Sequence, residues 1–250
     1  PRRNLSSNPI SFNYILPMIN MVKAKIREII QETPDIKRLI LELDKNMPFK
    51  AGQFVMLKID SERFDKLIPT RAYSIANAPN DKFEIQIIAK IIPDSNFSQY
   101  LDQLETHEEI EVQGPYGRFT LSDKDKTTEV TLLGAGTGVA PLVGIMEYAL
   151  QNNIKSHLIY CDKTDEDLIN IKRFDELTKN RKITSKILTT RDKDSERIKC
   201  HVTKEFLKEN LPTRKGLFYV CGPLEFVNNV VGYLEELGIE TDNIKTERYG

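Results

Sequence analysis

Residues 129–150, EVTLLGAGTGVAPLVGIMEYAL, constrain the fold most, because a strand, a glycine loop and a helix follow one another there without a break. Residues 130–133 favour a buried strand, whereas apolar residues at 139–150 recur at helical spacing. Gly134, Gly136 and Gly138 lie in the loop between them. Glycine permits positive φ and close approach of a ligand, and the N–H groups at the start of the following helix can bind phosphate. The stretch therefore predicts a pyrophosphate-binding loop.

The loop taken alone is also open to a second interpretation. It reads GAGTGVAP, which is neither the dinucleotide fingerprint G-x-G-x-x-G with its downstream acid nor a P-loop. Small residues also allow a tight strand-to-helix turn that binds nothing. The remainder of the chain has to decide between the two.

Composition excludes several classes of protein. The 36 basic and 37 acidic side chains leave a net charge of −1, so no overall field favours nucleic acid or an anionic membrane as partner. Cys161, Cys200 and Cys221 are too few and too widely spaced for a disulfide framework or an iron–sulfur cluster, and the histidines lack metal-ligand spacing. We therefore expect no metal and a reducing, cytoplasmic setting. The sequence contains no run of 18 apolar residues, so no membrane-spanning helix is predicted.

The chain divides into three parts by pattern. Residues 1–20 have no steady period and are expected to be an extension outside the folded domains. Residues 21–122 contain short β-rich runs separated by turn signals, which predicts an antiparallel barrel or sandwich. The expected strands cover 22–31, 36–43, 53–59, 70–76, 83–91 and 108–113, and a helix is expected at 97–104.

Residues 123–250 change to strand–helix alternation, which predicts a doubly wound parallel α/β sheet. Strands are expected at 129–133, 154–161, 183–189, 216–221 and 243–248. Helices are expected at 139–151, 166–179, 202–210 and 223–237.

A second motif, RAYS at 71–74, brings together a cation, an aromatic ring and a hydroxyl in four consecutive residues of the strand expected at 70–76. Alternation along the strand sends Arg71 and Tyr73 to one face and Ser74 to the other. Taken singly, these residues have an ordinary interpretation, in which Tyr73 fills the core and Arg71 pairs with a surface acid.

Four blocks together give a specific signal. RAYS at 71–74, GPYGRF at 114–119, GAGTGVAP at 134–141 and CGP at 221–223 follow one another across the change from β to α/β rhythm. From about residue 22 to residue 250 the chain resembles the ferredoxin-NADP reductase family of flavoproteins. The resemblance implies an N-terminal antiparallel β-barrel that binds flavin, followed by the α/β domain that binds a nicotinamide dinucleotide.

The resemblance also implies roles for residues of the first domain. Arg71 would bind the flavin phosphate, Tyr73 would lie against the isoalloxazine ring, and Ser74 would hydrogen-bond near N5, where hydride arrives. The resemblance implies FAD as the cofactor. The family's glycine-rich turn before the short helix is replaced here by DSNFS at 94–98, which leaves FMN open as the second choice. Further flavin-binding positions implied are Ala72, Ile88, Lys90, Asn96, Phe97, Ser98, Thr137 and Tyr249.

In the second domain the resemblance implies a dinucleotide site and two further catalytic residues. Cys221 would lie near the nicotinamide C4, although a buried, inert thiol is the alternative. Glu247 would lie close to both rings and relay protons, with a solvated terminal acid as the alternative. With Ser74, these two residues complete the implied catalytic set. The implied nucleotide-binding residues are Gly134, Gly136, Thr137, Gly138, Asp162, Arg191, Cys221, Gly222 and Pro223.

The choice between NADH and NADPH rests on the residues after the second strand of the α/β domain. Acids outnumber bases in DKTDED at 162–167, and a carboxylate such as Asp162 favours the ribose 2′-OH of NADH. Arg191 is an arginine of the kind that binds the 2′-phosphate of NADPH. We favour NADH and leave NADPH open.

The implied function is a flavin-dependent NAD(P)H oxidoreductase that passes electrons to a separate acceptor protein, such as a ferredoxin, a flavodoxin or an oxygenase component. A separate acceptor is expected because no four-cysteine segment follows Gly250. Two alternatives are a redox-sensing or electron-transfer subunit of a larger complex and a free flavin reductase. The joint presence of Ser74, Cys221 and Glu247 favours catalysis. The sequence does not predict an oligomeric state.

Overall fold

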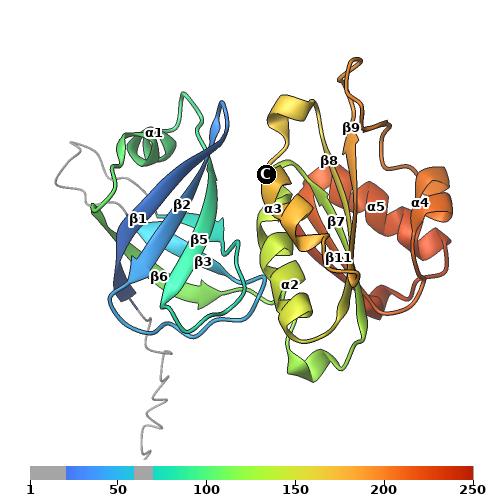
Figure 1. The fold of residues 1–250 in the computed structure, drawn as a ribbon, viewed down its shortest axis with the longest axis horizontal. Helices are drawn as coiled ribbons and strands as arrows, with labels where there is room; N and C mark the ends of the chain where they lie inside the picture. Colours follow the sequence, from blue (N-terminus) through green and yellow to red (C-terminus); the bar gives the residue numbers. More distant parts are fainter. Residues whose placement is uncertain (1–20, 59–69, 250) are drawn as a thin grey trace, which may run out of the picture.

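The computed structural model describes residues 21–58 and 70–249, which form two sheets lying side by side (Figure 1). The extension expected at residues 1–20 lies outside the described residues, and so does the end of the strand expected at 53–59. The strands of the first sheet come from the described residues up to 116, and those of the second come from residues 129–249.

The first sheet is antiparallel throughout, with strand order β4-β3-β6-β1-β2-β5. A bridge between Ile75, just after β4, and Ile87 of β5 joins the two ends of this order, so the sheet closes into a barrel. Helix α1 (Asn96–Gln103) lies at one end of the barrel (Figure 1). The strands are β1 (Met21–Thr33), β2 (Ile36–Leu43), β3 (Phe54–Lys58), β4 (Arg71–Ser74), β5 (Glu84–Lys90) and β6 (Glu109–Tyr116).

The barrel core follows from the alternation of its strands. In β1, Val22, Ala24 and Ile26 are buried while their neighbours are exposed, as expected for a strand with one face inside. These side chains meet Leu39 and Leu41 of β2 in one apolar cluster. Removing this surface from water is the main stabilising contribution to the barrel.

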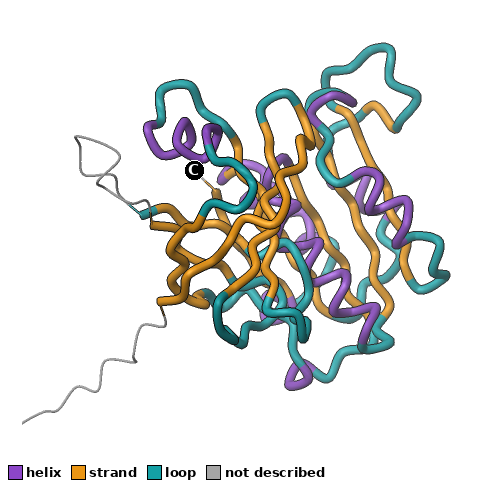
Figure 2. Tube along the Cα trace, turned by 60° about the vertical axis from the view of Figure 1, so that its left-hand side comes forward, coloured by secondary structure: helices purple, strands orange, loops and turns teal. Residues whose placement is uncertain are grey.

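The second sheet is parallel, with strand order β10-β9-β8-β7-β11-β12. Helices α2 (Val139–Gln151) and α3 (Ile171–Leu177) pack in the apolar cluster on the face toward the barrel. Helices α4 (Lys204–Asn210) and α5 (Leu224–Glu236) pack in the cluster on the other face (Figures 1 and 2). The strands are β7 (Glu129–Ala135), β8 (Lys155–Asp162), β9 (Ile183–Thr189), β10 (Ile198–Lys199), β11 (Leu217–Pro223) and β12 (Ile244–Tyr249).

The two domains share an apolar interface built around α2. Ile88 of the barrel belongs to the same buried cluster as Val139 and Met146 of α2. A polar contact lies at its edge, where the backbone N–H of Ala78 donates to Glu147 Oε2 at 3.0 Å. This packing fixes the carboxyl ends of the parallel strands against β4 of the barrel.

The predicted fold class is confirmed, since an antiparallel barrel precedes a doubly wound parallel sheet. Two details differ from prediction. The helix expected at 166–179 begins only at Ile171, because residues 165–167 form a separate 3₁₀ turn that Thr164 and Asp167 cap, and Asn170 has a left-handed φ of 60°. The two-residue strand β10 was not predicted, because both its residues are exposed and give no apolar pattern.

Candidate functional site

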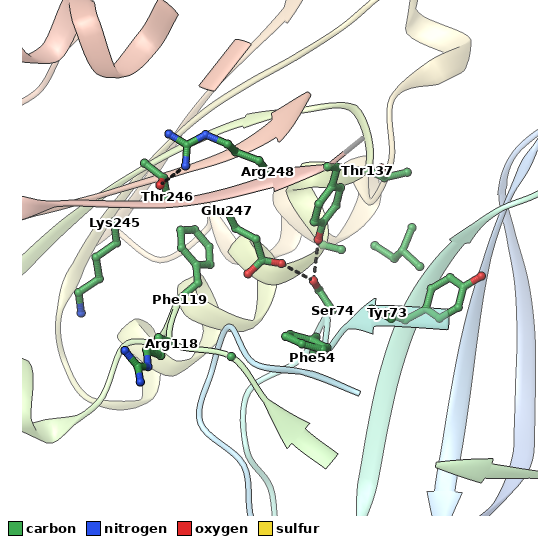
Figure 3. A pocket seen from close by; sticks show the side chains of 15 residues that line it. Phe54, Tyr73, Ser74, Arg118, Phe119, Thr137, Lys245, Thr246, Glu247 and Arg248 are labelled. Carbon is green, nitrogen blue, oxygen red and sulfur yellow. Dashed lines mark hydrogen bonds between the residues drawn. The ribbon is translucent and has the colours of Figure 1, made fainter. Parts of the chain in front are cut away.

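A cleft of about 730 Å³ lies where β4 of the barrel meets the carboxyl ends of the parallel strands (Figure 3). We call it the central cleft. Of the predicted site residues it brings together seven, from both domains. They are Ala72, Tyr73, Ser74, Ile88, Thr137, Glu247 and Tyr249.

Three of these side chains form one hydrogen-bonded group across the domain boundary. The Ser74 hydroxyl donates to Glu247 Oε1 at 3.1 Å, and its oxygen lies 2.6 Å from the Tyr249 hydroxyl (Figure 3). With Ser74 donating to the carboxylate, the Tyr249 hydroxyl is the donor in the second bond. Ser74 and Glu247 therefore contact each other although they are 173 residues apart in the sequence.

Burial controls the protonation of this group. It raises the pKa of the Glu247 carboxyl, and the hydrogen bond from Ser74 offsets part of that rise. Burial also raises the pKa of the Tyr249 hydroxyl well above its ordinary value, and the adjacent Cys221 and Glu247 add to the effect. Tyr249 therefore stays neutral, whereas Glu247 is able to hold a proton closer to neutrality than an exposed glutamate.

Cys221 lies behind the central cleft rather than in its lining. It is fully buried on β11, next to Glu247 of β12 in the sheet register, and its thiol contacts the Tyr249 hydroxyl. Burial raises the pKa of the Cys221 thiol, with a further rise from Glu247, so the reactive thiolate is disfavoured. The arrangement suits a residue that shapes the cleft and not one that attacks a substrate.

Aromatic rings border the central cleft on the barrel side. Tyr73 lies 6.0 Å from Phe97 of α1, ring centroid to ring centroid, at an interplanar angle of 29°. Burial raises the pKa of Tyr73 to about 12, although the charge of Arg71 opposes the rise. Phe54 of β3 also lines the cleft. Flat apolar walls next to the Ser74 hydroxyl fit a planar ring system with polar edge atoms, such as a flavin.

The glycine loop after β7 lies against β11. A Cβ on Gly138 would lie 2.4 Å from the carbonyl oxygen of Cys221, so only glycine fits this approach. Gly136 has a φ of +56°, in the left-handed region that glycine adopts readily. Gly134 is buried in β7, where a Cβ would meet Leu142 at 2.8 Å. Close packing thus explains two of the glycines, while Gly136 is open to a ligand.

A second cleft of about 590 Å³ lies beside the glycine loop, and we call it the lateral cleft. Thr137 lines both clefts, so they are adjacent. Of the predicted residues, the lateral cleft contains Lys90, Gly136, Thr137, Asp162, Arg191 and Pro223. A site that joins a loop of this kind to a row of strand ends is where open α/β sheets bind nucleotides.

Asp162, the last residue of β8, is one of the acids that line the lateral cleft. Its Oδ1 accepts from the backbone N–H of Lys163 at 2.9 Å, and its Oδ2 accepts from the Tyr160 hydroxyl at 3.2 Å. Burial raises the pKa of Asp162, the two hydrogen bonds oppose that rise, and the nearby Asp167 adds to it. Arg191 lines the same cleft.

Several predicted residues lie outside both clefts. Arg71 is exposed at the start of β4, and Asn96 begins α1. The Ser98 hydroxyl is used locally, because it donates to the carbonyl oxygen of Ile92 at 2.7 Å and accepts from the N–H of Ile92 at 2.9 Å. Gly222 lies beside Phe226 of α5. The flavin-phosphate roles of the first three therefore stay predictions.

Eight residues that line the central cleft were not among the predicted site residues: Phe54, Gly117, Arg118, Phe119, Ala140, Lys245, Thr246 and Arg248. Lys245 shares a strand face with Glu247 and Tyr249, two and four residues further on, so the period of β12 was the available signal. Its ammonium group donates to the carbonyl oxygen of Thr120 at 2.9 Å and to Asp125 Oδ1 at 2.5 Å. Phe54 gave no comparable signal.

Within residues 21–58 and 70–249, no group of three or more histidine, cysteine, aspartate or glutamate side chains is placed to hold a metal ion. In the same ranges, no helix combines the length and apolar character needed to cross a bilayer.

Comparison with known proteins assigns both halves of the chain. Residues 23–121 match the oxidoreductase FAD-binding domain, and residues 132–232 match the oxidoreductase NAD-binding domain. These are the cofactors that the sequence analysis expected, in the same order along the chain.

Individual relatives are similar at a lower level. The electron transfer component of 2-halobenzoate 1,2-dioxygenase from Burkholderia cepacia is 27% identical over 217 residues, covering 84% of this chain and 62% of its own length. NADH-cytochrome b5 reductase 2 from Candida glabrata is 28% identical over 223 residues, covering 84% of this chain and 74% of its own length. The chain thus spans less than two thirds of the dioxygenase component.

Among solved structures, the FAD/NAD-binding domain of nitric oxide dioxygenase from Vibrio cholerae has the same fold. Its TM-score is 0.82 at 21% identity, and the match covers 92% of this chain and 98% of that one.

Proposed function

Because the chain belongs to the ferredoxin-NADP reductase-like family of flavoproteins, we propose that it transfers hydride from a nicotinamide dinucleotide to FAD and delivers the electrons to a separate acceptor protein. FAD would bind to the barrel at 21–122 and the dinucleotide to the α/β domain at 123–250. The supporting observation is the group of Ser74, Glu247 and Tyr249, which joins the two domains where the central and lateral clefts meet at Thr137.

FAD supplies the redox chemistry, since it accepts a hydride and releases electrons singly or in pairs, which no side chain can do. The protein supplies position and proton control. The Ser74 hydroxyl, held between Glu247 and Tyr249, gives a fixed hydrogen-bond partner at the ring edge. Burial raises the pKa of the Glu247 carboxyl, so this side chain would take up a proton more readily than an exposed glutamate. Tyr249 covers the cleft from the side of the second domain.

We propose the remaining flavin contacts from the resemblance. The Arg71 guanidinium and backbone N–H groups near Asn96 would bind the phosphates, since Ser98 uses its hydroxyl locally. Tyr73 and Phe97 would border the ring and its linker.

We propose NADH as the dinucleotide. Asp162 and Asp167 both line the lateral cleft, where a carboxylate accepts hydrogen bonds from a ribose hydroxyl and repels a 2′-phosphate. Lys90, Lys163 and Arg191 line the same cleft as cations, and Arg191 is the one that a 2′-phosphate would be expected to contact. The similar protein from Candida glabrata is named as an NADH enzyme, which supports the same choice.

We propose that the acceptor is an acidic protein, such as a ferredoxin, a flavodoxin or an acidic oxygenase component. Arg118 and Arg248 are exposed at the central cleft. Arg248 donates only to the neutral oxygens of Asn228 and Thr246, and Arg118 has no side-chain partner within the ranges that the structure describes. Unneutralised cations at the cleft mouth would attract an acidic surface.

The direct test is cofactor content and nucleotide preference. The purified protein should retain or take up FAD, and it should reduce an artificial electron acceptor with NADH at a higher kcat/KM than with NADPH. A protein that binds neither FAD nor FMN would refute the proposed function. An Asp162→Ala variant should lose the preference for NADH.

A further inference from the structure

Tyr160 is a fully buried tyrosine on β8, two residues before Asp162, which lines the lateral cleft. Its ring packs edge-on against Phe174 of α3, with centroids 6.0 Å apart at 64°. The ring alone would fill this space as phenylalanine, so packing does not explain the hydroxyl. A buried hydroxyl is retained at low cost only if it has hydrogen-bond partners.

Both partners of the hydroxyl belong to the lateral cleft. It donates to Asp162 Oδ2 at 3.2 Å and accepts from the backbone N–H of Ile169 at 3.1 Å. Asp162 points into the cleft, and Ile169 ends the segment that carries Asp167, which lines the same cleft. One phenol oxygen thus connects the two acidic positions that face the dinucleotide.

The hydrogen bond from the Tyr160 hydroxyl is one of two that hold the Asp162 carboxylate in place. Oδ1 is held by the N–H of Lys163 at 2.9 Å, and Oδ2 is held by Tyr160. Two donors on different oxygens set both the direction of the carboxylate plane and its side-chain rotamer. The same two donors favour the ionised form of an acid whose pKa burial raises.

The bond to Ile169 fixes the segment after β8. Thr164 and Asp167 cap the short 3₁₀ turn in this segment, with Thr164 Oγ1 donating to Asp167 Oδ2 at 2.7 Å. One residue beyond Ile169, the N–H of Asn170 donates to Glu32 Oε2 of the barrel at 3.0 Å. The segment is therefore held at both ends, by its own turn and by the Tyr160 hydroxyl next to the domain contact.

We propose that Tyr160 is a positioning residue for nucleotide selectivity, whose hydroxyl holds the Asp162 carboxylate in place to bind the ribose 2′-OH and to reject a 2′-phosphate. This inference rests on the proposed function, because it presupposes that NADH binds in the lateral cleft. It adds a determinant that never touches the dinucleotide.

The test is Tyr160→Phe, measured as kcat and KM for NADH and for NADPH with the FAD-loaded protein. The ratio of kcat/KM for NADH to that for NADPH should fall about tenfold, as expected for loss of one hydrogen bond to a charged group. The change should lie in the KM for NADH, with kcat at saturating NADH within about twofold of the original, because the removed contact acts on binding.

The matched control is Tyr148→Phe, which also removes a tyrosine–aspartate hydrogen bond. The Tyr148 hydroxyl donates to Asp123 Oδ1 at 2.6 Å, and neither residue lines either cleft. This variant should keep the original selectivity ratio. If both variants lost selectivity equally, the effect would be general destabilisation and the inference would be overturned.

A double-mutant cycle separates Tyr160 from other determinants. In an Asp162→Ala background, Tyr160→Phe should leave the selectivity ratio unchanged, because its effect passes through the carboxylate. A tenfold loss in that background as well would overturn the inference.

The outcomes distinguish the inference from the proposed function. An NADH-selective protein whose ratio survives Tyr160→Phe, or whose kcat falls equally with both dinucleotides, overturns the inference alone. A protein that oxidises neither dinucleotide, or that prefers NADPH, overturns the proposed function and the inference with it.

Discussion

Replacing Ser74 by alanine tests the hydrogen-bonded group at the domain junction. The substitution removes the bond of 3.1 Å to Glu247 and the bond of 2.6 Å to Tyr249, and it leaves both partners in a water-poor place. A hydrogen bond to a charged group contributes about 1.5–3 kcal/mol. If the hydroxyl positions the ring edge for hydride transfer, the same energy appears in the barrier, which corresponds to a rate about 10- to 150-fold lower.

The assay is anaerobic stopped-flow mixing of the FAD-loaded protein with NADH, followed by the loss of flavin absorbance. Flavin content should stay unchanged, because the proposed phosphate contacts lie elsewhere. Ser156→Ala is the matched control, since Ser156 is also buried and lines neither cleft, and its hydroxyl has no hydrogen-bond partner among the residues that the structure describes. Equal bleaching rates for wild type and Ser74→Ala would refute the role of Ser74, and equal slowing in both variants would show a nonspecific effect.

Three further predictions address other parts of the account. Because burial raises the folded-state pKa of Glu247 above its ordinary value of 4.5, its contribution to stability is present below pH 4.5 and is lost as the pH rises through the folded pKa. Glu247→Gln should therefore raise the melting temperature at pH 7 and change it little below pH 4.5. A difference in melting temperature between variant and wild type that is the same at all pH values would contradict this. Gly138→Ala should lower the free energy of unfolding by about 1–3 kcal/mol, because its Cβ would clash with the Cys221 carbonyl. Gly232→Ala in α5 should raise the free energy of unfolding by about 0.5–1 kcal/mol, because its Cβ would meet nothing within 4 Å. Denaturant titration measures both changes, and the same sign for the two variants would reject the packing argument. Arg118→Gln should raise the KM for an acidic ferredoxin several-fold at low salt and little at high salt, with no such rise for a basic cytochrome c. Equal effects on the KM values of the two acceptors would argue against recognition of the acceptor by its charge.

The fold was largely predictable because its signals are local. Alternation in β1 and the strand–loop–helix run from β7 to α2 each depend on residues within about one element's length. Boundaries failed where short-range capping overrode periodicity. Thr164 and Asp167 close a separate turn, and Asn170 adopts a left-handed conformation, so α3 starts five residues later than the predicted helix at 166–179.

The glycine loop could be predicted from local pattern, whereas the meeting of Ser74 with Glu247 was predictable only through the resemblance. No local pattern brings Ser74 to Glu247, because their contact spans 173 residues and depends on how the barrel docks on α2. The role of Tyr160 could not be predicted from the sequence for a related reason. In the sequence it is one more apolar strand residue, and only the folded structure shows its hydroxyl between Asp162 and Ile169.

The central claim is that hydride passes directly from NADH to FAD at the junction of the two clefts. The most direct measurement is the rate of flavin bleaching under anaerobic conditions with NADH and with NADH deuterated at C4. We expect rapid bleaching that slows on deuteration, because the covalent bond between C4 and the transferred hydrogen breaks in that step. FAD and NADH that both bind without bleaching the flavin would contradict it.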